Sequence, residues 1–289
     1  MGVLRFAVLG PGGVGGLLAA LLARAGDSVV VLHDTPLHEV RVESARFGDF
    51  TAQVETSPRL SEPVDAVLVT VKATQLEPAM RRVPVDALGA ALVIPFLNGI
   101  DHVELLRGVY PSASVVPATI RIESTKVGAG VIRQTSPFAL VEIGSRGEAV
   151  ASRLTAAGLD VKIVDDEHAM LWSKLAVLAP MALLTTHERA NVGGVRERRH
   201  DDLEGLVREF AAVARAEGVA IDPEVNLGFI EKTPAAMETS MQRDQAAGRP
   251  LEIDALGGAL LRRAAKAGVD VPVTKRLVEE LRARTSTYA

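Results

Sequence analysis

The chain has 289 residues and a formal net charge of −4, and its length suggests about two domains at roughly 150 residues each. An apolar fraction of 48% and a charged fraction of 24% are typical of globular proteins and argue against disorder. The mildly acidic balance argues against a dedicated nucleic-acid binder. Because there is no cysteine, disulfides, thiolate metal sites, iron–sulfur clusters and a cysteine nucleophile are excluded, and we expect no bound metal.

The chain has no recognisable targeting or membrane segment. Its first apolar run ends at Gly10 after one strand's length, whereas a signal peptide needs a basic start and a longer apolar stretch. The longest apolar stretches fall short of the ~20 residues that span a bilayer. We therefore expect a cytoplasmic protein without a membrane partner.

Strand-like and helix-like segments alternate through the first half of the chain. Four short apolar runs predict buried strands, at residues 5–9, 28–32, 66–71 and 91–97. Residues 14–25 have the length and composition of a helix. Near-continuous apolar strands flanked by helices indicate a parallel sheet covered on both faces. Residues 115–144 predict antiparallel strands, and residues 161–164 predict a last strand.

From residue 165 onward the sequence has almost no strand signal. It predicts helices instead, at residues 165–184, 201–217, 253–267 and 274–284. Pro180 marks a possible kink in the first of them. The fold class is therefore α/β, with an N-terminal Rossmann-type dinucleotide-binding domain over residues 1–165 and an all-helical domain over residues 166–289. The apolar helices also permit a homodimer.

A glycine-rich loop joins the first predicted strand to the first predicted helix. Its sequence is Gly10-Pro11-Gly12-Gly13-Val14-Gly15. This fits the G-x-G-x-x-G pattern of dinucleotide-binding loops, in the place where such a loop belongs. Gly10 would permit the tight turn, Gly12 would let the backbone approach a pyrophosphate, and Gly15 would let helix and strand pack closely. A purely structural turn is the alternative.

Asp34 predicts which nicotinamide cofactor the loop would bind. It follows the second predicted strand, 19 residues beyond Gly15, close to the ~20 residues expected of the acidic residue that accepts ribose hydroxyl hydrogen bonds. Because a carboxylate there would repel a 2′-phosphate, we expect NAD(P)H as cofactor with a preference for NADH. An ordinary loop aspartate is the alternative.

Polar residues follow two other predicted strands. Lys72 and Gln75 come just after residues 66–71, and Asn98 follows residues 91–97. Ligands bind at the carboxyl ends of parallel strands, so we expect these side chains to face the same crevice as the glycine loop. A solvated lysine and an Asn-Gly turn are the alternatives.

Two charged residues of the helical half are also candidates. Lys174 precedes an apolar stretch unbroken by charge, and a lysine at the head of a buried helix can have the lowered pKa that acid–base chemistry needs. Glu252 lies just before an apolar helix with two glycines. A surface lysine and a glutamate in a first helical turn are the alternatives.

Together these segments resemble the ketopantoate reductase (2-dehydropantoate 2-reductase) family over nearly the full length of the chain. Besides the glycine loop, the matching segments are Val71-Lys72-Ala73-Thr74-Gln75, Leu97-Asn98-Gly99, Trp172-Ser173-Lys174-Leu175, Thr239-Ser240-Met241 with Asp244, and Glu252-Ile253-Asp254. The resemblance implies nicotinamide-dependent reduction of a small 2-oxo acid, with 2-dehydropantoate of pantothenate biosynthesis as the first candidate. It also implies a cleft between a Rossmann domain and a helical domain.

The resemblance further implies a role for each candidate residue. Lys174 would be the general acid that protonates the forming alkoxide, and Glu252 would bind and orient the substrate and the lysine. The remaining implied contacts are Lys72 and Asn98 to both cofactor and substrate, Gln75 to the cofactor and Ser240 to the substrate carboxylate.

Several positions depart from the family pattern. Leu178, Ala182 and Met237 stand where the family usually has asparagines that line the substrate pocket, and Asp34 stands where it commonly has an arginine for the 2′-phosphate. A pocket without those amides predicts a more apolar 2-oxo acid as an alternative substrate. A non-catalytic NAD(P)-binding regulatory protein is a second alternative. A 3-hydroxy acid dehydrogenase would need a different catalytic pattern in the helical domain.

Overall fold

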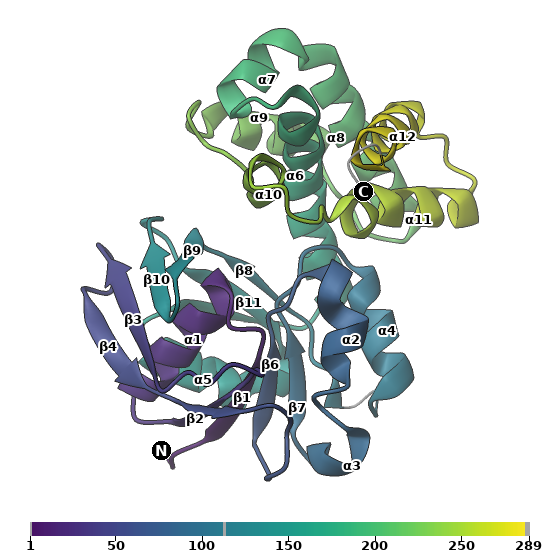
Figure 1. Ribbon diagram of the computed structural model, residues 1–289. Coiled ribbons are helices and arrows are strands. Elements are labelled where there is room, and N and C mark those ends of the chain that lie inside the picture. The colour runs from purple at the N-terminus through teal and green to yellow at the C-terminus, as the bar shows by residue number, and fades with distance from the viewer. Residues whose placement is uncertain (1, 112–113, 287–289) are drawn as a thin grey trace. The chain divides into compact units, whose positions relative to one another are not determined.

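The computed structural model describes residues 2–111 and 114–286, and the chain folds into two compact units (Figure 1). The first unit comprises Met1–Leu97 and His102–Met170, and the second comprises Asn98–Asp101 and Leu171–Ala289. The contacts thus divide the chain a few residues beyond the predicted position 165. They also assign a four-residue segment from the first half of the sequence to the second unit.

A five-stranded parallel sheet forms the centre of the first unit, in the order β5-β2-β1-β6-β7. Its strands are β1 (Arg5–Leu9), β2 (Ser28–Leu32), β5 (Glu55–Ser57), β6 (Ala66–Val69) and β7 (Leu92–Pro95). The side chains from Phe6 to Leu9 in the central strand are at most 1% exposed, because elements cover both faces of the sheet. The predicted Rossmann-type sheet is confirmed.

Helix α1 (Gly13–Arg24) packs between this sheet and a second sheet of four strands (Figure 1). The second sheet has the order β4-β3-β10-β9, with β3 (Glu39–Ser44), β4 (Phe50–Gln53), β9 (Ser124–Gly128) and β10 (Val131–Gln134). Strands β3, β4 and β5 were not predicted from the sequence. They are short, and β3 alternates between exposed and buried residues rather than forming a continuous apolar run.

A third sheet has the order β12-β11-β8, with β8 (Ala118–Arg121), β11 (Leu140–Gly144) and β12 (Asp160–Val164). The antiparallel strands predicted within residues 115–144 are present as two pairs, β9 with β10 and β8 with β11. These pairs lie in different sheets, and β10 and β11 each also pair in parallel with another strand, β3 and β12 respectively. The unit also contains the helices α2 (Leu76–Met80), α3 (Val85–Leu88), α4 (Asp101–Val109) and α5 (Glu148–Ala156), and the 3₁₀ turn η3 (Ser145–Gly147). The first residue of α4, Asp101, is assigned to the second unit.

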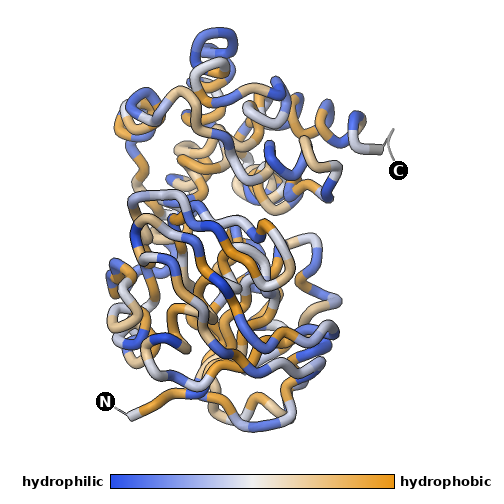
Figure 2. Tube along the Cα trace, turned by 60° about the vertical axis from the view of Figure 1, so that its left-hand side comes forward, coloured by the Kyte–Doolittle hydropathy of each residue, from blue (hydrophilic) through white to orange (hydrophobic). Residues whose placement is uncertain are grey.

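Within the described residues, the second unit contains helices and connecting loops and no strand. Its helices are α6 (Glu167–Glu188), which begins in the first unit, α7 (Val192–Arg198), α8 (His200–Ala216), α9 (Pro223–Lys232), α10 (Ser240–Ala246), the π-helical turn η4 (Asp254–Gly258), α11 (Ala259–Ala267) and α12 (Pro272–Ser286). Hydrophobic and hydrophilic stretches alternate along these helices in Figure 2. The amphipathic helix predicted at residues 201–217 is confirmed as α8, with Leu203, Leu206 and Phe210 at most 1% exposed.

Helix α6 is the most apolar helix of this unit and contains Pro180. By length and hydropathy it is long enough to cross a membrane, so the expectation that every apolar stretch is too short does not hold for it. However, 72% of its most apolar window is buried, as in the core helix of a soluble protein. Its apolar character is therefore explained by packing.

Helix α12 begins on a buried carboxylate. Glu209 of α8 accepts hydrogen bonds from the backbone N–H of Val273 at 2.7 Å and of Thr274 at 2.8 Å, and from the Thr274 hydroxyl at 2.6 Å. Helix N-termini leave backbone N–H groups without helical partners, and a carboxylate is a strong acceptor for them. Glu209 thus fixes α12 against α8.

Candidate functional site

The glycine loop turns sharply from β1 into α1. Gly10 has φ +100°, a conformation that side chains disfavour, and its carbonyl accepts hydrogen bonds from the Gly12 N–H and from the Thr70 hydroxyl, both at 2.8 Å. Thr70 follows β6, the neighbour of β1, and its hydroxyl also donates to the Leu9 carbonyl at 3.0 Å. The loop is therefore braced by the adjacent strand.

Most glycines of this loop are explained by packing. A Cβ on Gly15 would collide with the Gly10 carbonyl and the Thr70 hydroxyl, and one on Gly13 would collide with the Ser124 backbone of β9. Gly15 thus allows the close approach of helix and strand that the sequence suggested. Gly13 has a packing role that was not predicted from the sequence.

Gly12 differs from its neighbours in the loop. It has φ −79°, it is exposed, and a Cβ built on it would meet no atom within 4 Å. It is the N-cap of α1 and provides no side-chain hydrogen bond to the first N–H groups of the helix. The first turn of α1 thus presents backbone N–H groups beside open space, which suits a phosphate.

Lys72 and Gln75 lie next to this loop. Lys72 precedes the 3₁₀ turn η1 (Ala73–Gln75), in which the Gln75 N–H donates to the Lys72 carbonyl at 2.9 Å. A Cβ on Gly10 would lie 2.6 Å from the Val71 side chain, so the two loops touch immediately before Lys72. Lys72 is half-buried and Gln75 is exposed. The structure thus brings both residues to the carboxyl edge that carries the glycine loop.

Asp34 lies beyond the end of β2 and is held by Arg82. The Arg82 guanidinium donates to both carboxylate oxygens, at 2.8 Å for Oδ1, and also to the Pro58 carbonyl at 2.7 Å. This bidentate hydrogen bond lowers the pKa of Asp34, which therefore remains a carboxylate. Arg82 was not predicted as a site residue, since no local pattern links it to a residue 48 positions earlier.

Asn98 and Glu252 lie together in the second unit. The Asn98 side-chain amide is 3.5 Å from Glu252 Oε2, although 154 positions separate the two residues. Glu252 is only 5% exposed. Gly99, with φ +87°, approaches Ala255 so closely that any Cβ would collide with the Ala255 carbonyl. Asn98 follows the end of β7 by three residues, and its contacts assign it to the second unit.

Lys174 lies in the second turn of α6 and is half-buried. Because residues three or four apart share a helix face, Leu178 and Ala182 continue the stripe that Lys174 begins, and Thr185 follows on it. The Thr185 hydroxyl is 2.8 Å from that of Thr239, which caps α10 at the residue before Ser240. The stripe thus runs from the predicted acid toward the predicted substrate contact Ser240, which is exposed.

The chain leading to Glu252 is fixed by a buried aspartate. Asp244 in α10 is 3% exposed, and it accepts a hydrogen bond at 2.8 Å from Arg249, whose own N–H donates to the Asp244 carbonyl at 2.9 Å. These contacts close a tight loop three residues before Glu252. Asp244 belongs to a motif of the sequence, but this role for it was not predicted.

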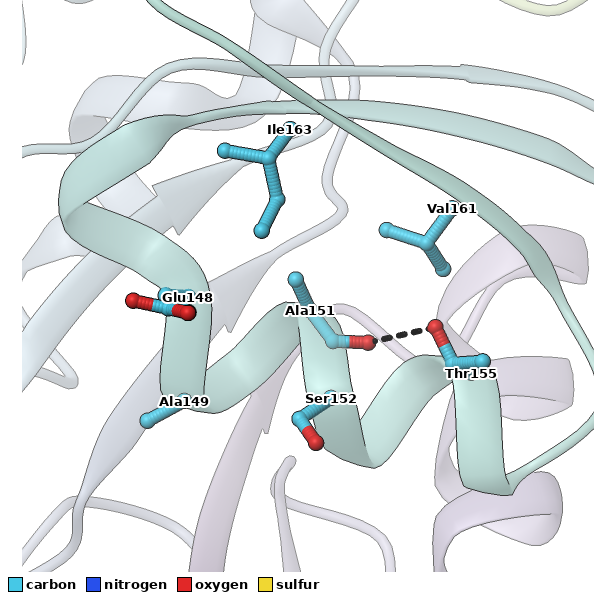
Figure 3. Close-up of a pocket in the computed structure, with 7 residues that line it drawn as sticks. All are labelled: Glu148, Ala149, Ala151, Ser152, Thr155, Val161 and Ile163. Atoms are coloured by element: carbon cyan, nitrogen blue, oxygen red, sulfur yellow. Dashed lines mark hydrogen bonds between the residues drawn. The ribbon is translucent and has the colours of Figure 1, made fainter.

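Two other features of the structure lie apart from these residues. A groove of about 500 Å³ between α5 and β12 is lined by Glu148, Ala149, Ala151, Ser152, Thr155, Val161 and Ile163 (Figure 3). It shares no residue with the predicted site. Within the described residues, no group of three or more His, Asp or Glu side chains could hold a metal ion.

Comparisons with known proteins match both units. The family model described as ketopantoate reductase PanE/ApbA matches residues 6–148, and its C-terminal counterpart matches residues 167–285. A 2-dehydropantoate 2-reductase from Mycobacterium tuberculosis is 34% identical over 96% of both chains. A PanE/ApbA family ketopantoate reductase from Ralstonia eutropha superposes with a TM-score of 0.88 at 28% identity, covering 98% of this chain and 99% of that one. A D-mandelate dehydrogenase, solved with NADH and anilino(oxo)acetate, has the same fold with a TM-score of 0.88 at 22% identity, over 98% of both chains.

Proposed function

The chain belongs to the ketopantoate reductase family of oxidoreductases, and from that premise we propose that it reduces 2-dehydropantoate to pantoate with a nicotinamide cofactor. The contact between Asn98 and Glu252 carries this proposal, because it joins two distant segments that the family pattern assigns to one reaction. Lys174 and Ser240 belong to the same unit.

The glycine loop fits the pyrophosphate of a dinucleotide. Gly12 leaves open the space that a Cβ would fill, and the first turn of α1 directs N–H groups and the positive end of its dipole toward it. Pro11 and Val14 complete the loop, and Lys72 and Gln75 flank it as further cofactor contacts.

The chemistry assigned to this chain's residues follows from charge. A nicotinamide bound here would supply a hydride to the carbonyl carbon, and negative charge would then develop on the carbonyl oxygen. The Lys174 ammonium stabilises that charge and donates a proton to the oxygen, which contributes about 10²–10⁴-fold. Glu252 orients the ammonium and the substrate, and Asn98 donates a hydrogen bond beside it. Lys72 and Ser240 bind polar groups of the anionic substrate.

We propose that NADH is preferred over NADPH. The Asp34 carboxylate, whose pKa Arg82 lowers below its ordinary acidic value, is charged at neutral pH, so it accepts hydrogen bonds from ribose hydroxyls and repels a 2′-phosphate. A dehydrogenase of the same fold contains NADH in its solved structure. Asp34→Ala should therefore raise kcat/KM for NADPH relative to NADH.

Arg82 supplies the opposite variant. Arg82→Ala leaves the Asp34 carboxylate without its partner and should increase the discrimination against NADPH. Initial rates with each cofactor, at a fixed 2-oxo acid concentration, measure the ratio of kcat/KM for NADPH to kcat/KM for NADH in each variant. Equal ratios in the wild type and both variants would contradict the role given to Asp34.

A more apolar 2-oxo acid is the second candidate substrate. Leu178 and Ala182 lie on the helix stripe that begins at Lys174, and they offer no hydrogen-bond donor or acceptor to a substrate hydroxyl. Met237 stands at a third such position. A kcat/KM higher for an aliphatic or aromatic 2-oxo acid than for 2-dehydropantoate would favour this candidate.

Steady-state kinetics of the wild type and two lysine variants test the proposal. Lys174→Ala should lower kcat by about 10²–10⁴-fold and leave NADH affinity intact. Lys275→Ala, at an exposed position of α12, is the matched control and should keep wild-type kcat. Near-wild-type turnover of Lys174→Ala would remove that residue from the mechanism.

The same assay distinguishes a non-catalytic alternative. Tight NADH binding without oxidation of NADH or NADPH by any 2-oxo acid would refute the reductase and favour a dinucleotide-binding regulatory protein. We further propose a cytoplasmic protein, and a homodimer as its assembly. The exposed apolar side chains of Val225 and Phe229 on α9 support the dimer, which sedimentation equilibrium would test.

A further inference from the structure

A series of polar contacts within the second unit links residues that lie close in sequence to Asn98, Lys174 and Glu252. The Arg263 guanidinium of α11 donates to Asp101 at 3.0 and 3.2 Å on one side, and to both Glu217 oxygens at 2.9 Å on the other. The Trp172 indole N–H of α6 donates to the same Glu217 carboxylate at 3.0 Å. We refer to Asp101, Arg263, Glu217 and Trp172 as the ion-pair chain.

The ends of the ion-pair chain lie close in sequence to the predicted site. Asp101 ends the four-residue segment that begins with Asn98, and Trp172 lies two positions before Lys174. Arg263 lies on the helix that continues the π-helical turn after Glu252. The segments that carry all three reaction residues are therefore tied to one guanidinium.

The centre of the ion-pair chain is more buried than a surface ion pair, so losing one partner would leave the other poorly solvated. The Trp172 ring is fully buried, and only 12% of the Arg263 side chain is exposed. Burial alone would lower the pKa of Arg263, but Glu217 and Asp101 together raise it, so the guanidinium remains charged. Arg262 provides a contrast, because it donates to the other Asp101 oxygen at 2.8 Å but its side chain is half exposed, and the partners described for it do not include Glu217.

We propose that the ion-pair chain positions Asn98, Lys174 and Glu252 for the reduction, with Arg263 as its central positioning residue. This role rests on the function proposed above. A reacting group displaced by about 1 Å can cost on the order of 10²-fold in rate. Loss of the link should therefore lower turnover, although none of the roles proposed above gives a member of the ion-pair chain a substrate contact.

The experiment compares kcat, KM for 2-dehydropantoate and NADH affinity across matched variants. Arg263→Met should lower kcat/KM for the 2-oxo acid by between about 10-fold and 10²-fold. NADH affinity should fall much less than kcat/KM, because the glycine loop belongs to the other unit and Asn98 is only one of the proposed cofactor contacts. Arg262→Met, which leaves the link to Glu217 in place, should stay within about threefold of the wild type.

Two conservative variants separate positioning from folding. Glu217→Gln keeps an oxygen that accepts from Trp172 and Arg263, so it should retain far more activity than Glu217→Ala. Trp172→Phe keeps a buried aromatic ring but removes the N–H donor together with part of the buried indole volume. It should lower kcat severalfold while remaining folded. Because Trp172 is the only tryptophan, its emission spectrum reports directly on the link in the Arg263 and Glu217 variants.

The outcomes separate this role from the proposed function. A wild-type protein without 2-oxo acid reduction overturns the proposed function, and with it this role. The wild type can instead be active while the folded Arg263→Met and Trp172→Phe variants keep wild-type kcat/KM. That result overturns the positioning role alone. An equal loss in Arg262→Met also overturns it, since the loss would then reflect surface charge near Asp101.

Discussion

Gly12 is the glycine of the G-x-G-x-x-G loop for which packing gives no reason, and its replacement tests the nucleotide-binding role directly. With φ −79° and no atom within 4 Å of an added methyl group, alanine fits at this position without strain. Alanine is a poorer N-cap than glycine by about 0.5–1 kcal/mol. A lower entropy of the unfolded chain offsets that by ~0.4–1 kcal/mol. The free energy of unfolding should therefore change by less than about 1 kcal/mol.

Binding should respond differently from stability in Gly12→Ala. The added methyl group occupies the open space beside the first turn of α1, where the backbone would approach a pyrophosphate. NADH affinity should fall by at least about tenfold, since 1.4 kcal/mol corresponds to that factor. Urea unfolding measures the first quantity, and quenching of NADH fluorescence on titration measures the second.

Gly15→Ala is the matched control, because there the methyl group meets backbone. It would collide with the Gly10 carbonyl and the Thr70 hydroxyl, and overpacking of this kind costs about 1–3 kcal/mol of stability. The two variants should thus separate, with Gly12→Ala losing affinity and Gly15→Ala losing stability. A folded Gly12→Ala protein that binds NADH as tightly as the wild type would refute the assignment of this loop to the pyrophosphate.

Two further predictions concern stability. Glu209→Ala removes all three hydrogen bonds to the start of α12 and leaves their donors buried, so the free energy of unfolding in urea should fall by about 3–5 kcal/mol. Glu209→Gln should lose less, and a loss below about 1 kcal/mol in Glu209→Ala would contradict the capping role. Burial raises the pKa of Tyr110 to about 12, above the unfolded value of about 10, so its contribution to stability is complete below pH 10 and is lost as the pH rises toward 12. Between about pH 10 and 12, the free energy of unfolding of Tyr110→Phe should decline less steeply than that of the wild type. The variant also loses the 2.8 Å hydrogen bond from the Tyr110 hydroxyl to the Val83 carbonyl. Identical slopes in the two proteins would contradict the prediction.

The parts of the fold that the sequence predicted are those whose signal is local. The strand at residues 5–9 is a continuous apolar run because both faces of β1 are covered, and α8 shows helical spacing because one side of it packs inward. Strand β3 was not predicted, since its alternation of exposed and buried residues is short and includes several charges. The pairing of β10 with β3 joins segments about ninety positions apart, which no local pattern encodes.

The candidate site divides along the same line, and the division has a physical cause. A glycine in the motif can be required by packing within the fold or by the approach of a ligand. Gly15 must lack a Cβ because backbone lies against it, whereas nothing in the fold requires Gly12 to lack one. The sequence pattern detects both constraints and cannot separate them. Charged partners present the opposite case, because Arg82 and Arg263 lie in no distinctive motif. They acquire their roles only from carboxylates that lie 46, 48 and 162 positions away. Local sequence patterns therefore identify residues that belong to a motif, and they miss residues that act by joining segments distant in sequence.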